Sequence, residues 1–289
     1  MRILSSIILL TALIQSLNGQ IITGRIIDLS NGSPLEYASI GAIGTSAGCV
    51  TDKEGKFNID VTGLPKDIII RASMISYHPQ SFTIDELNKK DIIIKLHPSP
   101  IQLTEVIIRP SGKTRKVGVT ANSDIDKGLW GWVGTDLGKG REKGSTITLG
   151  NKPVTLLSLH LNLYFHSFDT SIFRLHIRKI DKGMPATELL SENIFIPITV
   201  KEGWVDFDLS KYNLQFYGDV ALTLEWVNAI GINSERKLIN QKNNTPRIYF
   251  YIKTGRGNSI FVKQGVENSW VYDNRRNPCF YLTVQELQK

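Results

Sequence analysis

Short runs in which hydrophobic and polar residues alternate cover most of the chain, and a period of two residues is typical of β-strands. The longest run spans residues 154–166, where Leu159 and Leu161 alternate with His160 and Asn162. Successive side chains of a strand point to opposite faces, so this run predicts a half-buried strand. The same pattern recurs at residues 173–177, 205–209, 222–226, 248–252 and 280–284. Half-buried strands of this kind predict antiparallel sheets packed face to face.

A second set of runs lies between residues 21 and 108, at 21–29, 38–43, 49–52, 56–61, 67–73, 80–84, 91–96 and 103–108. One run per eleven residues falls within the spacing of about 8–12 residues expected of a sandwich or barrel. Turn-forming residues separate the runs, most clearly at 30–34, 53–55 and 62–65. We therefore predict an all-β chain, with one sandwich before residue 108 and a second one after it.

The first 20 residues have the pattern of a secretory signal peptide. Arg2 precedes an apolar stretch at residues 7–14, and small and polar residues follow it. The stretch is too short for a membrane-spanning helix, which needs about 20 apolar residues. We expect cleavage after Gly19, and no transmembrane segment in the mature chain. This predicts an extracytoplasmic protein that is periplasmic, associated with the outer membrane, or secreted.

The chain has 289 residues, which suits two domains, and a formal net charge of +7 that is scattered along it. The one local cluster is formed by Arg109, Lys113, Arg115 and Lys116 in a stretch that also holds glycine, proline and serine. This composition predicts a linker at residues 109–126. No recognition helix or aromatic stacking motif accompanies the charge, so we expect no nucleic-acid partner.

Three motifs in the first region carry a family resemblance. Residues 24–28 read Gly-Arg-Ile-Ile-Asp, residues 33–40 read Ser-Pro-Leu-Glu-Tyr-Ala-Ser-Ile, and residues 51–57 read Thr-Asp-Lys-Glu-Gly-Lys-Phe. In the third motif, Asp52 suits the start of a turn and Gly55 supplies a positive φ. Together the motifs resemble the carboxypeptidase-regulatory-like domain, with a serine in place of the glycine of the family's Ile-Gly-Tyr at residues 75–77.

The resemblance covers residues 21–108 and implies a transthyretin-like β-sandwich that is itself non-catalytic. Such a domain is an accessory module in many secreted bacterial proteins and in the N-terminal part of TonB-dependent receptors. The later strands are similar to jelly-roll modules of secreted bacterial proteins. The predicted organisation is a signal peptide at 1–19, a carboxypeptidase-regulatory-like sandwich at 20–108, a linker at 109–126 and a jelly-roll-like sandwich at 127–289.

The catalytic motifs lack the context that their chemistry requires. Residues 44–48 form the Gly-x-Ser-x-Gly string of a hydrolase nucleophile elbow around Ser46, but this string lies between two β-runs and no helix follows it. We therefore interpret it as a turn. None of the five histidines is followed three residues later by Glu, the spacing expected of a zinc carboxypeptidase.

Two histidines remain candidate metal ligands. We expect residues 154–166 and 172–179 to pair as a hairpin, which would bring His160 and His176 near each other on one face. Arg174 and Arg178 share that face and would repel a cation. We therefore expect a solvated sheet face there, with no bound metal and no cofactor.

Aromatic and acidic residues give a candidate binding site. Trp204, Asp206 and Asp208 alternate with apolar residues and are expected on one outward face, and Tyr249 and Tyr251 form a similar row. A sugar could stack on the indole ring while the carboxylates accept hydrogen bonds from its hydroxyl groups. The alternative is that Trp204 covers a sheet edge or packs under a loop, as large aromatic residues usually do.

The leading hypothesis is a non-enzymatic secreted or cell-envelope accessory protein, whose partner is a glycan or another envelope protein. One alternative is a carbohydrate-binding protein that uses the second sandwich, and another is a hydrolase with an unrecognised site. Cys49 and Cys279 fall in different predicted domains, so we expect two thiols rather than a disulfide.

Overall fold

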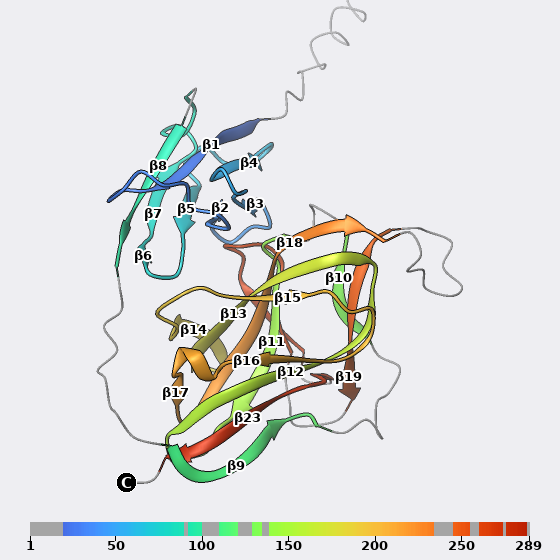
Figure 1. Ribbon diagram of the computed structural model, residues 1–289. Helices are drawn as coiled ribbons and strands as arrows, with labels where there is room; N and C mark the ends of the chain where they lie inside the picture. The colour runs from blue at the N-terminus through green and yellow to red at the C-terminus, as the bar shows by residue number, and fades with distance from the viewer. Residues whose placement is uncertain are drawn as a thin grey trace, which may run out of the picture.

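The computed structural model describes residues 20–89, 92–99, 110–120, 129–134, 139–233, 245–254, 260–273 and 276–287. Two β domains are stacked, with the N-terminal domain seated at one end of the longer C-terminal domain (Figure 1). The described residues contain no α-helix and one short 3-10 helix, η1 (Ser210–Tyr212). The predicted all-β fold is confirmed. Within these ranges, no helix has both the length and the apolar character needed to cross a membrane.

The N-terminal domain is a sandwich of two four-stranded sheets. One sheet has the order β4 (Lys56–Asp60), β1 (Ile21–Asp28), β8 (Ile92–Pro98) and β6 (Tyr77–His78). The other has the order β3 (Gly48–Val50), β2 (Ser39–Ala42), β5 (Ile69–Ser73) and β7 (Gln80–Thr83). Strands form at seven of the eight predicted runs, and the eighth run, at 103–108, lies outside the described residues.

The turn before β4 forms as its sequence predicts. The Asp52 carboxylate accepts hydrogen bonds from the backbone N–H groups of Glu54 at 3.0 Å and Lys56 at 2.8 Å. Gly55 has φ +72°, a conformation that favours glycine. The side chains of Phe57 and Ile59 then alternate into the core with those of β2 and β5.

The C-terminal domain is also built from two sheets. The first has the order β10 (Leu129–Val133), β19 (Arg247–Thr254), β12 (Val154–His166), β23 (Phe280–Leu287) and β9 (Pro110–Gly118), with β16 (Gly203–Asp208) and β17 (Gln215–Phe216) on β12 and β22 (Arg276–Pro278) on β19. The second has the order β14 (Met184–Glu188), β13 (Phe168–Asp181), β18 (Asp219–Ile232), β11 (Glu142–Thr148), β20 (Ile260–Lys263) and β21 (Trp270–Asp273), with β15 (Ile194–Ile198) on β13.

One core fills the space between these two sheets. Trp132 of β10 packs against Phe173 of the opposite sheet, with ring centroids 4.9 Å apart, and Phe250 lies beside both. Trp226 is fully buried in the same cluster. The inward residues of the predicted runs, including Leu161 and Leu163, supply the rest of the apolar contacts.

The hairpin expected between residues 154–166 and 172–179 does not form. β12 and β13 follow each other in the chain but lie in different sheets, and β13 pairs with β18 instead. Both strands carry a long apolar face, and each buries that face against the other sheet across the core. The chain passes from one sheet to the other at Ser167, whose N–H and hydroxyl both donate hydrogen bonds to the carbonyl oxygen of Arg247.

Part of the stretch that we predicted to be a linker is a strand. β9 occupies Pro110–Gly118 and pairs antiparallel with β23. Arg115 donates a hydrogen bond to the carbonyl oxygen of Leu149 and forms an ion pair with Glu286 at 3.5 Å. The basic residues at 113–116 therefore belong to an edge strand of the C-terminal domain, along the lower rim of the molecule in Figure 1.

Candidate binding site at the domain junction

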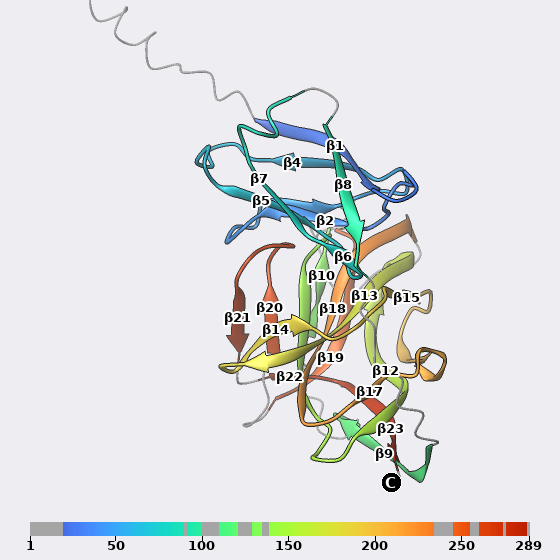
Figure 2. The same ribbon diagram turned by 90° about the vertical axis from the view of Figure 1, so that its left-hand side faces the viewer.

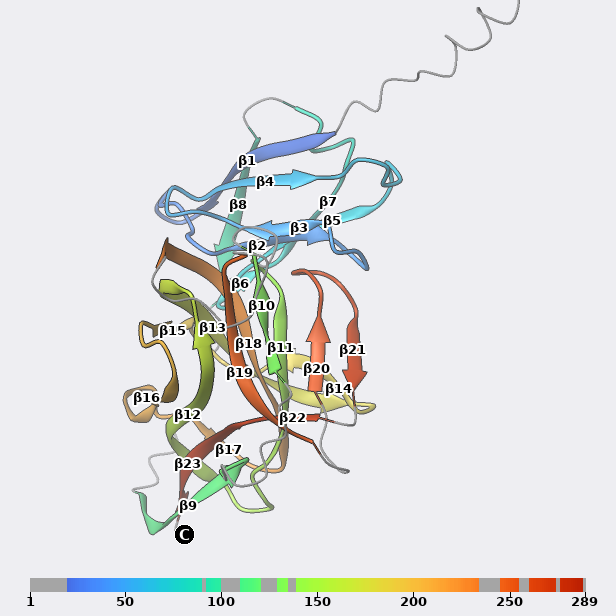
Figure 3. The same cartoon turned by 90° about the vertical axis from the view of Figure 1, so that its right-hand side faces the viewer.

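The N-terminal domain covers part of the outer face of the second sheet. Its β3-β2-β5-β7 sheet faces the C-terminal domain, and β1 and β4 lie on the far side (Figures 2 and 3). Tyr37 anchors the contact, because its ring meets Phe195 at 5.2 Å and its hydroxyl accepts a hydrogen bond from Asn228 at 3.2 Å. Val227 and Val266 complete a small apolar cluster around Tyr37.

A row of charged side chains crosses the sheet beneath this contact. Arg174, Glu225, Glu142 and Lys263 are paired across β13, β18, β11 and β20, and Trp270 of β21 stands opposite Lys263. Residues paired in this way project from the same face of a sheet. We call these five residues the charged row. Arg174 and Glu142 are each 1% exposed and Glu225 is 3% exposed, so these three ionic side chains are buried, while Lys263 and Trp270 are half-buried.

The two adjacent carboxylates of the row are held by surrounding cations. Arg178 and Thr223 donate to one oxygen of Glu142, and Lys263 Nζ lies 2.9 Å from the other in an ion pair without hydrogen-bond geometry. Burial alone would raise the pKa of Glu142. The charges of Arg178, His176 and Lys263 outweigh that effect and hold the pKa well below its usual range.

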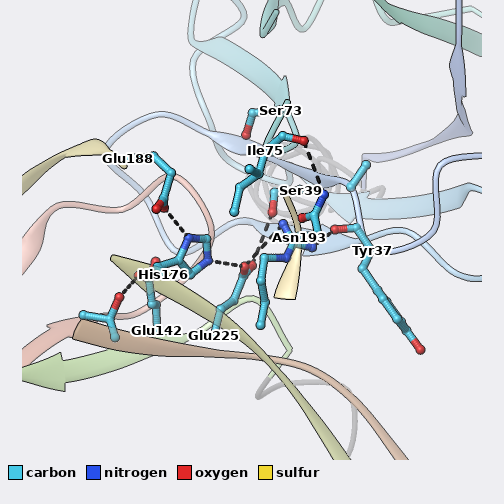
Figure 4. Close-up of polar contacts among 12 residues, drawn as sticks. Tyr37, Ser39, Ser73, Ile75, Glu142, His176, Glu188, Asn193 and Glu225 are labelled. Carbon is cyan, nitrogen blue, oxygen red and sulfur yellow. Dashed lines mark hydrogen bonds and ion pairs between the residues drawn. The ribbon is translucent and has the colours of Figure 1, made fainter. Parts of the chain in front are cut away.

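His176 joins two carboxylates from different strands (Figure 4). Its Nδ1 lies 2.6 Å from Glu188, and its Nε2 lies 3.0 Å from Glu225. Burial and the neighbouring Arg178 lower the pKa of His176, but the carboxylates of Glu142 and Glu188 more than offset them, so the pKa is raised. For Glu225, burial is outweighed by Arg174 and His176, which lower the pKa to about 2.

Both domains contribute to a cavity of about 700 Å³ above the charged row. We call it the junction cavity. Arg71 and Ser73 of β5 line one wall, and Lys263 and Trp270 line another. Lys263 Nζ lies 5.1 Å from the centre of the Trp270 ring, which gives a cation–π contact. Within the described ranges, no group of three or more His, Cys, Asp or Glu side chains is arranged to hold a metal ion.

Most of this site was not predicted from the sequence. The alternation correctly places Arg174, His176 and Arg178 on one face, but we expected that face to be solvated. His176 is 5% exposed because Glu188 of β14, Glu225 and Arg178 surround it. A signal in the sequence was Glu225, a charged residue between Leu224 and Trp226 in a mostly apolar strand.

The predicted aromatic site lies elsewhere, on the outer face of the first sheet. Trp204 is half-buried on β16, and Asp206 and Asp208 are exposed on the same strand. Among the contacts that the structure describes, the aromatic neighbour of Trp204 is Tyr281 of β23, at 5.2 Å. Tyr249 and Tyr251 of β19 are half-buried. Their neighbours differ from that of Trp204: Tyr251 contacts Tyr164, with ring centroids 5.1 Å apart, and Arg247 lies 5.9 Å from the centre of the Tyr249 ring.

His160 and His176, which we expected side by side, are on different sheets. The structure instead pairs His160 with Asp206, whose carboxylate lies 2.5 Å from Nδ1. Ser46 lies in the turn between β2 and β3, as predicted, rather than on a strand–turn–helix elbow. Cys49 and Cys279 are both thiols, and burial raises the pKa of Cys49 to about 11.

Comparison with known proteins shows which family the N-terminal domain is similar to. No curated protein matches the sequence. One similar structure contains the cysteine protease and lectin-like domains of Cwp84, a surface-layer-associated protein of Clostridium difficile. The two sequences are 10% identical and the TM-score is 0.37, and the match covers 88% of this chain and 59% of that one. Another is that of the infectious bursal disease virus Gx strain, with 9% identity, a TM-score of 0.25 and coverage of 92% and 64%. This chain thus spans about three fifths of their length. Residues 22–108 match the family model of the CarboxypepD_reg-like domain, which confirms the resemblance carried by the N-terminal motifs.

Proposed function

We propose that this chain is a non-enzymatic accessory protein, secreted or held in the cell envelope, that binds a small acidic ligand between its two domains. The observation that carries the proposal is the junction cavity, which neither domain forms alone. Ligand sites are commonly concave, lie at domain interfaces and present a few fixed polar groups. The CarboxypepD_reg-like domain supports an accessory role, since it supplies one wall of the cavity.

The charges around the cavity favour an anion. Its lining holds four carboxylates, and with a protonated His176 it holds five positive groups, namely Arg71, Arg174, Arg178, Lys263 and His176. Arg71 has five N–H donors and forms an ion pair with Glu267 at 2.5 Å, so most of its donors remain for a ligand. Lys263 likewise has three donors and a single carboxylate partner. A ligand carboxylate between these two cations would complete their hydrogen bonding.

Calorimetric titration of the full chain with citrate and with a free-acid dipeptide tests the cavity. We expect binding of the acids but not of their amides. Arg71→Gln should weaken binding tenfold to a hundredfold, since a charge-assisted hydrogen bond contributes about 1.5–3 kcal/mol. Thr187→Trp, which places a large ring at the exposed cavity wall, should block binding, and Lys152→Gln on the exposed surface should not. Unchanged affinity in both cavity variants would contradict the proposal.

The proposed location is tested by sequencing the N-terminus of the chain recovered from an envelope or culture fraction. We expect the mature protein to begin at Gln20, after removal of residues 1–19. Recovery of the chain in the cytoplasm with residues 1–19 still attached would show that the leader is not processed.

One arrangement gives the non-enzymatic part of the proposal its sharpest test. Ser158, His160 and Asp206 are hydrogen-bonded in the order Ser–His–Asp, at 2.8 Å and 2.5 Å. Thr283 also meets His160 Nε2, at 2.9 Å, and backbone N–H groups in a sheet point toward neighbouring strands rather than outward to an oxyanion. We expect a fluorophosphonate probe to leave Ser158 unlabelled. Labelling that disappears in Ser158→Ala would overturn the non-enzymatic proposal.

A further inference from the structure

Four side chains on the outer face of the first sheet form a fixed polar and aromatic group. Trp204 and Asp206 project from β16, His160 from β12 and Tyr281 from β23. The Trp204 and Tyr281 rings meet edge to face, with centroids 5.2 Å apart. His160 lies flat against Tyr281, with centroids 4.2 Å apart and planes 13° apart. We call these four residues the aromatic face.

The side chains of the aromatic face are held in position before any ligand binds. The His160 ring stacks on Tyr281, and its two nitrogens meet Asp206 on one side and Ser158 and Thr283 on the other. These partners lie on three neighbouring strands, so the backbone ladders hold them in place. A site built on strands and locked by supporting hydrogen bonds loses little freedom when a ligand binds.

Asp206 is the carboxylate of β16 that lies next to Trp204 on this face, and Asp208 lies one position farther along the strand face. The Asp206 side chain is 71% exposed and uses one oxygen for His160, which leaves the other open to solvent. Asp208 accepts hydrogen bonds from the backbone N–H of Ser210 at 2.9 Å and from its hydroxyl at 2.6 Å. Asp208 thus fixes the turn into η1 through one oxygen, and of the two predicted carboxylates Asp206 is the nearer to Trp204 and the one in the aromatic face.

Trp204 and Asp206 are spaced to contact a single small ring. They are alternate residues of β16, so their Cα atoms are about 6–7 Å apart on one face. A ring that stacks on the indole would bring its edge hydroxyls to the Asp206 carboxylate. Lys116, an exposed cation 5.0 Å from the centre of the Tyr281 ring, borders the same surface and can donate hydrogen bonds.

We propose that the aromatic face binds a saccharide, with a sugar ring stacked on Trp204 and its hydroxyls hydrogen-bonded to Asp206 and Lys116. The composition favours a sugar over a protein partner. One half-buried indole lies among hydroxyl, carboxylate, imidazole and ammonium groups, whereas protein interfaces centre on larger apolar patches. The site is separate from the junction cavity, which lies on the other sheet.

An array of neutral α- and β-linked hexasaccharides, followed by titration with those retained, tests the proposal on the full chain. We expect Trp204→Ala to reduce affinity at least tenfold with only a small change in melting temperature. Asp206→Asn should weaken binding less. Tyr217→Ala removes a strongly exposed aromatic ring outside the aromatic face and is the matched control. Thr187→Trp, in the junction cavity, should leave sugar retention unchanged, which separates this site from the proposed acid-binding one.

Three results would overturn the inference. The first is that the unmodified chain retains no hexasaccharide at millimolar concentration. The second is that Trp204→Ala binds as well as the unmodified chain. If Trp204→Ala fails to fold, Asp206→Asn and Lys116→Gln report on the same site, and unchanged binding in both is the third.

Discussion

Glu142 and Glu225 stand directly opposite each other on β11 and β18, and both are buried. Like charges in this position destabilise a sheet unless cations compensate them. The compensation comes from Arg174, Arg178 and Lys263 together with the protonated His176. Removing one member of a buried ionic network is costly, because its partners remain buried without compensation.

Glu225→Gln should lower the free energy of unfolding by about 3–5 kcal/mol near neutral pH. The pKa of Glu225 in the folded chain is about 2, against an ordinary value of 4.5. A lowered pKa contributes stability above pH 4.5 that is lost as the pH falls toward 2. Urea titrations from pH 7 to pH 2.5 should therefore show a steeper acid loss in the unmodified chain than in Glu225→Gln. Parallel pH profiles would show that Glu225 is not the source of the acid sensitivity.

The contribution of His176 to stability has the opposite dependence on pH. Its raised pKa contributes stability that is fully present below pH 6.5, its ordinary value, and is lost as the pH rises through the raised value. His176→Gln should therefore destabilise the chain at pH 6 more than at pH 9, as measured by the urea midpoint. A cost that does not change between these pH values would mean that the imidazole is neutral in the folded chain.

At the scale of elements, the strands could be predicted and their partners could not. Alternation identifies where a strand runs, because one face must be apolar, and it located β12, β13 and β18. It does not say which strand lies alongside, so β12 and β13 were wrongly paired with each other. The charged row depends on the registers of β13, β18, β11 and β20, which come from distant segments, and no local pattern shows them.

The backbones of β11 and β18 lie close together at Gly144, and this allows a prediction for β11. A Cβ atom at this position would overlap the carbonyl oxygen of Leu222 and crowd Thr223 of β18. Gly144→Ala should therefore push β11 from β18 and cost about 1–3 kcal/mol, as overpacked substitutions do. Thr148→Ala, at an exposed position on the same strand, is the control. Equal melting temperatures for the two variants would mean that β18 yields without strain.

At the scale of the whole molecule, we expect a protease to divide the chain into its two domains at the segment that joins them. β9 and its contacts to β23 protect Lys113, Arg115 and Lys116, and trypsin does not cut the Arg109–Pro110 bond, so we expect a glutamate-specific protease to cut after Glu105. The domains are nevertheless joined through side chains. Arg174 donates to the carbonyl oxygen of Tyr37, Ser39 donates to Glu225 at 3.3 Å, and Arg71 pairs with Glu267.

Cleavage should therefore give two bands on a denaturing gel and a single peak on gel filtration. The fragments stay together because Tyr37 fills a pocket beside Phe195 and Val227, and the ion pairs around it are largely buried. Tyr37→Ala removes the ring and the hydroxyl bonded to Asn228, and its cleaved fragments should separate, first in high salt, which screens the Arg71–Glu267 pair. Tyr37→Phe keeps the ring and should keep the single peak. Separation of the unmodified fragments in low salt would show that the junction does not hold the domains together, and the acid-binding proposal would lose its cavity.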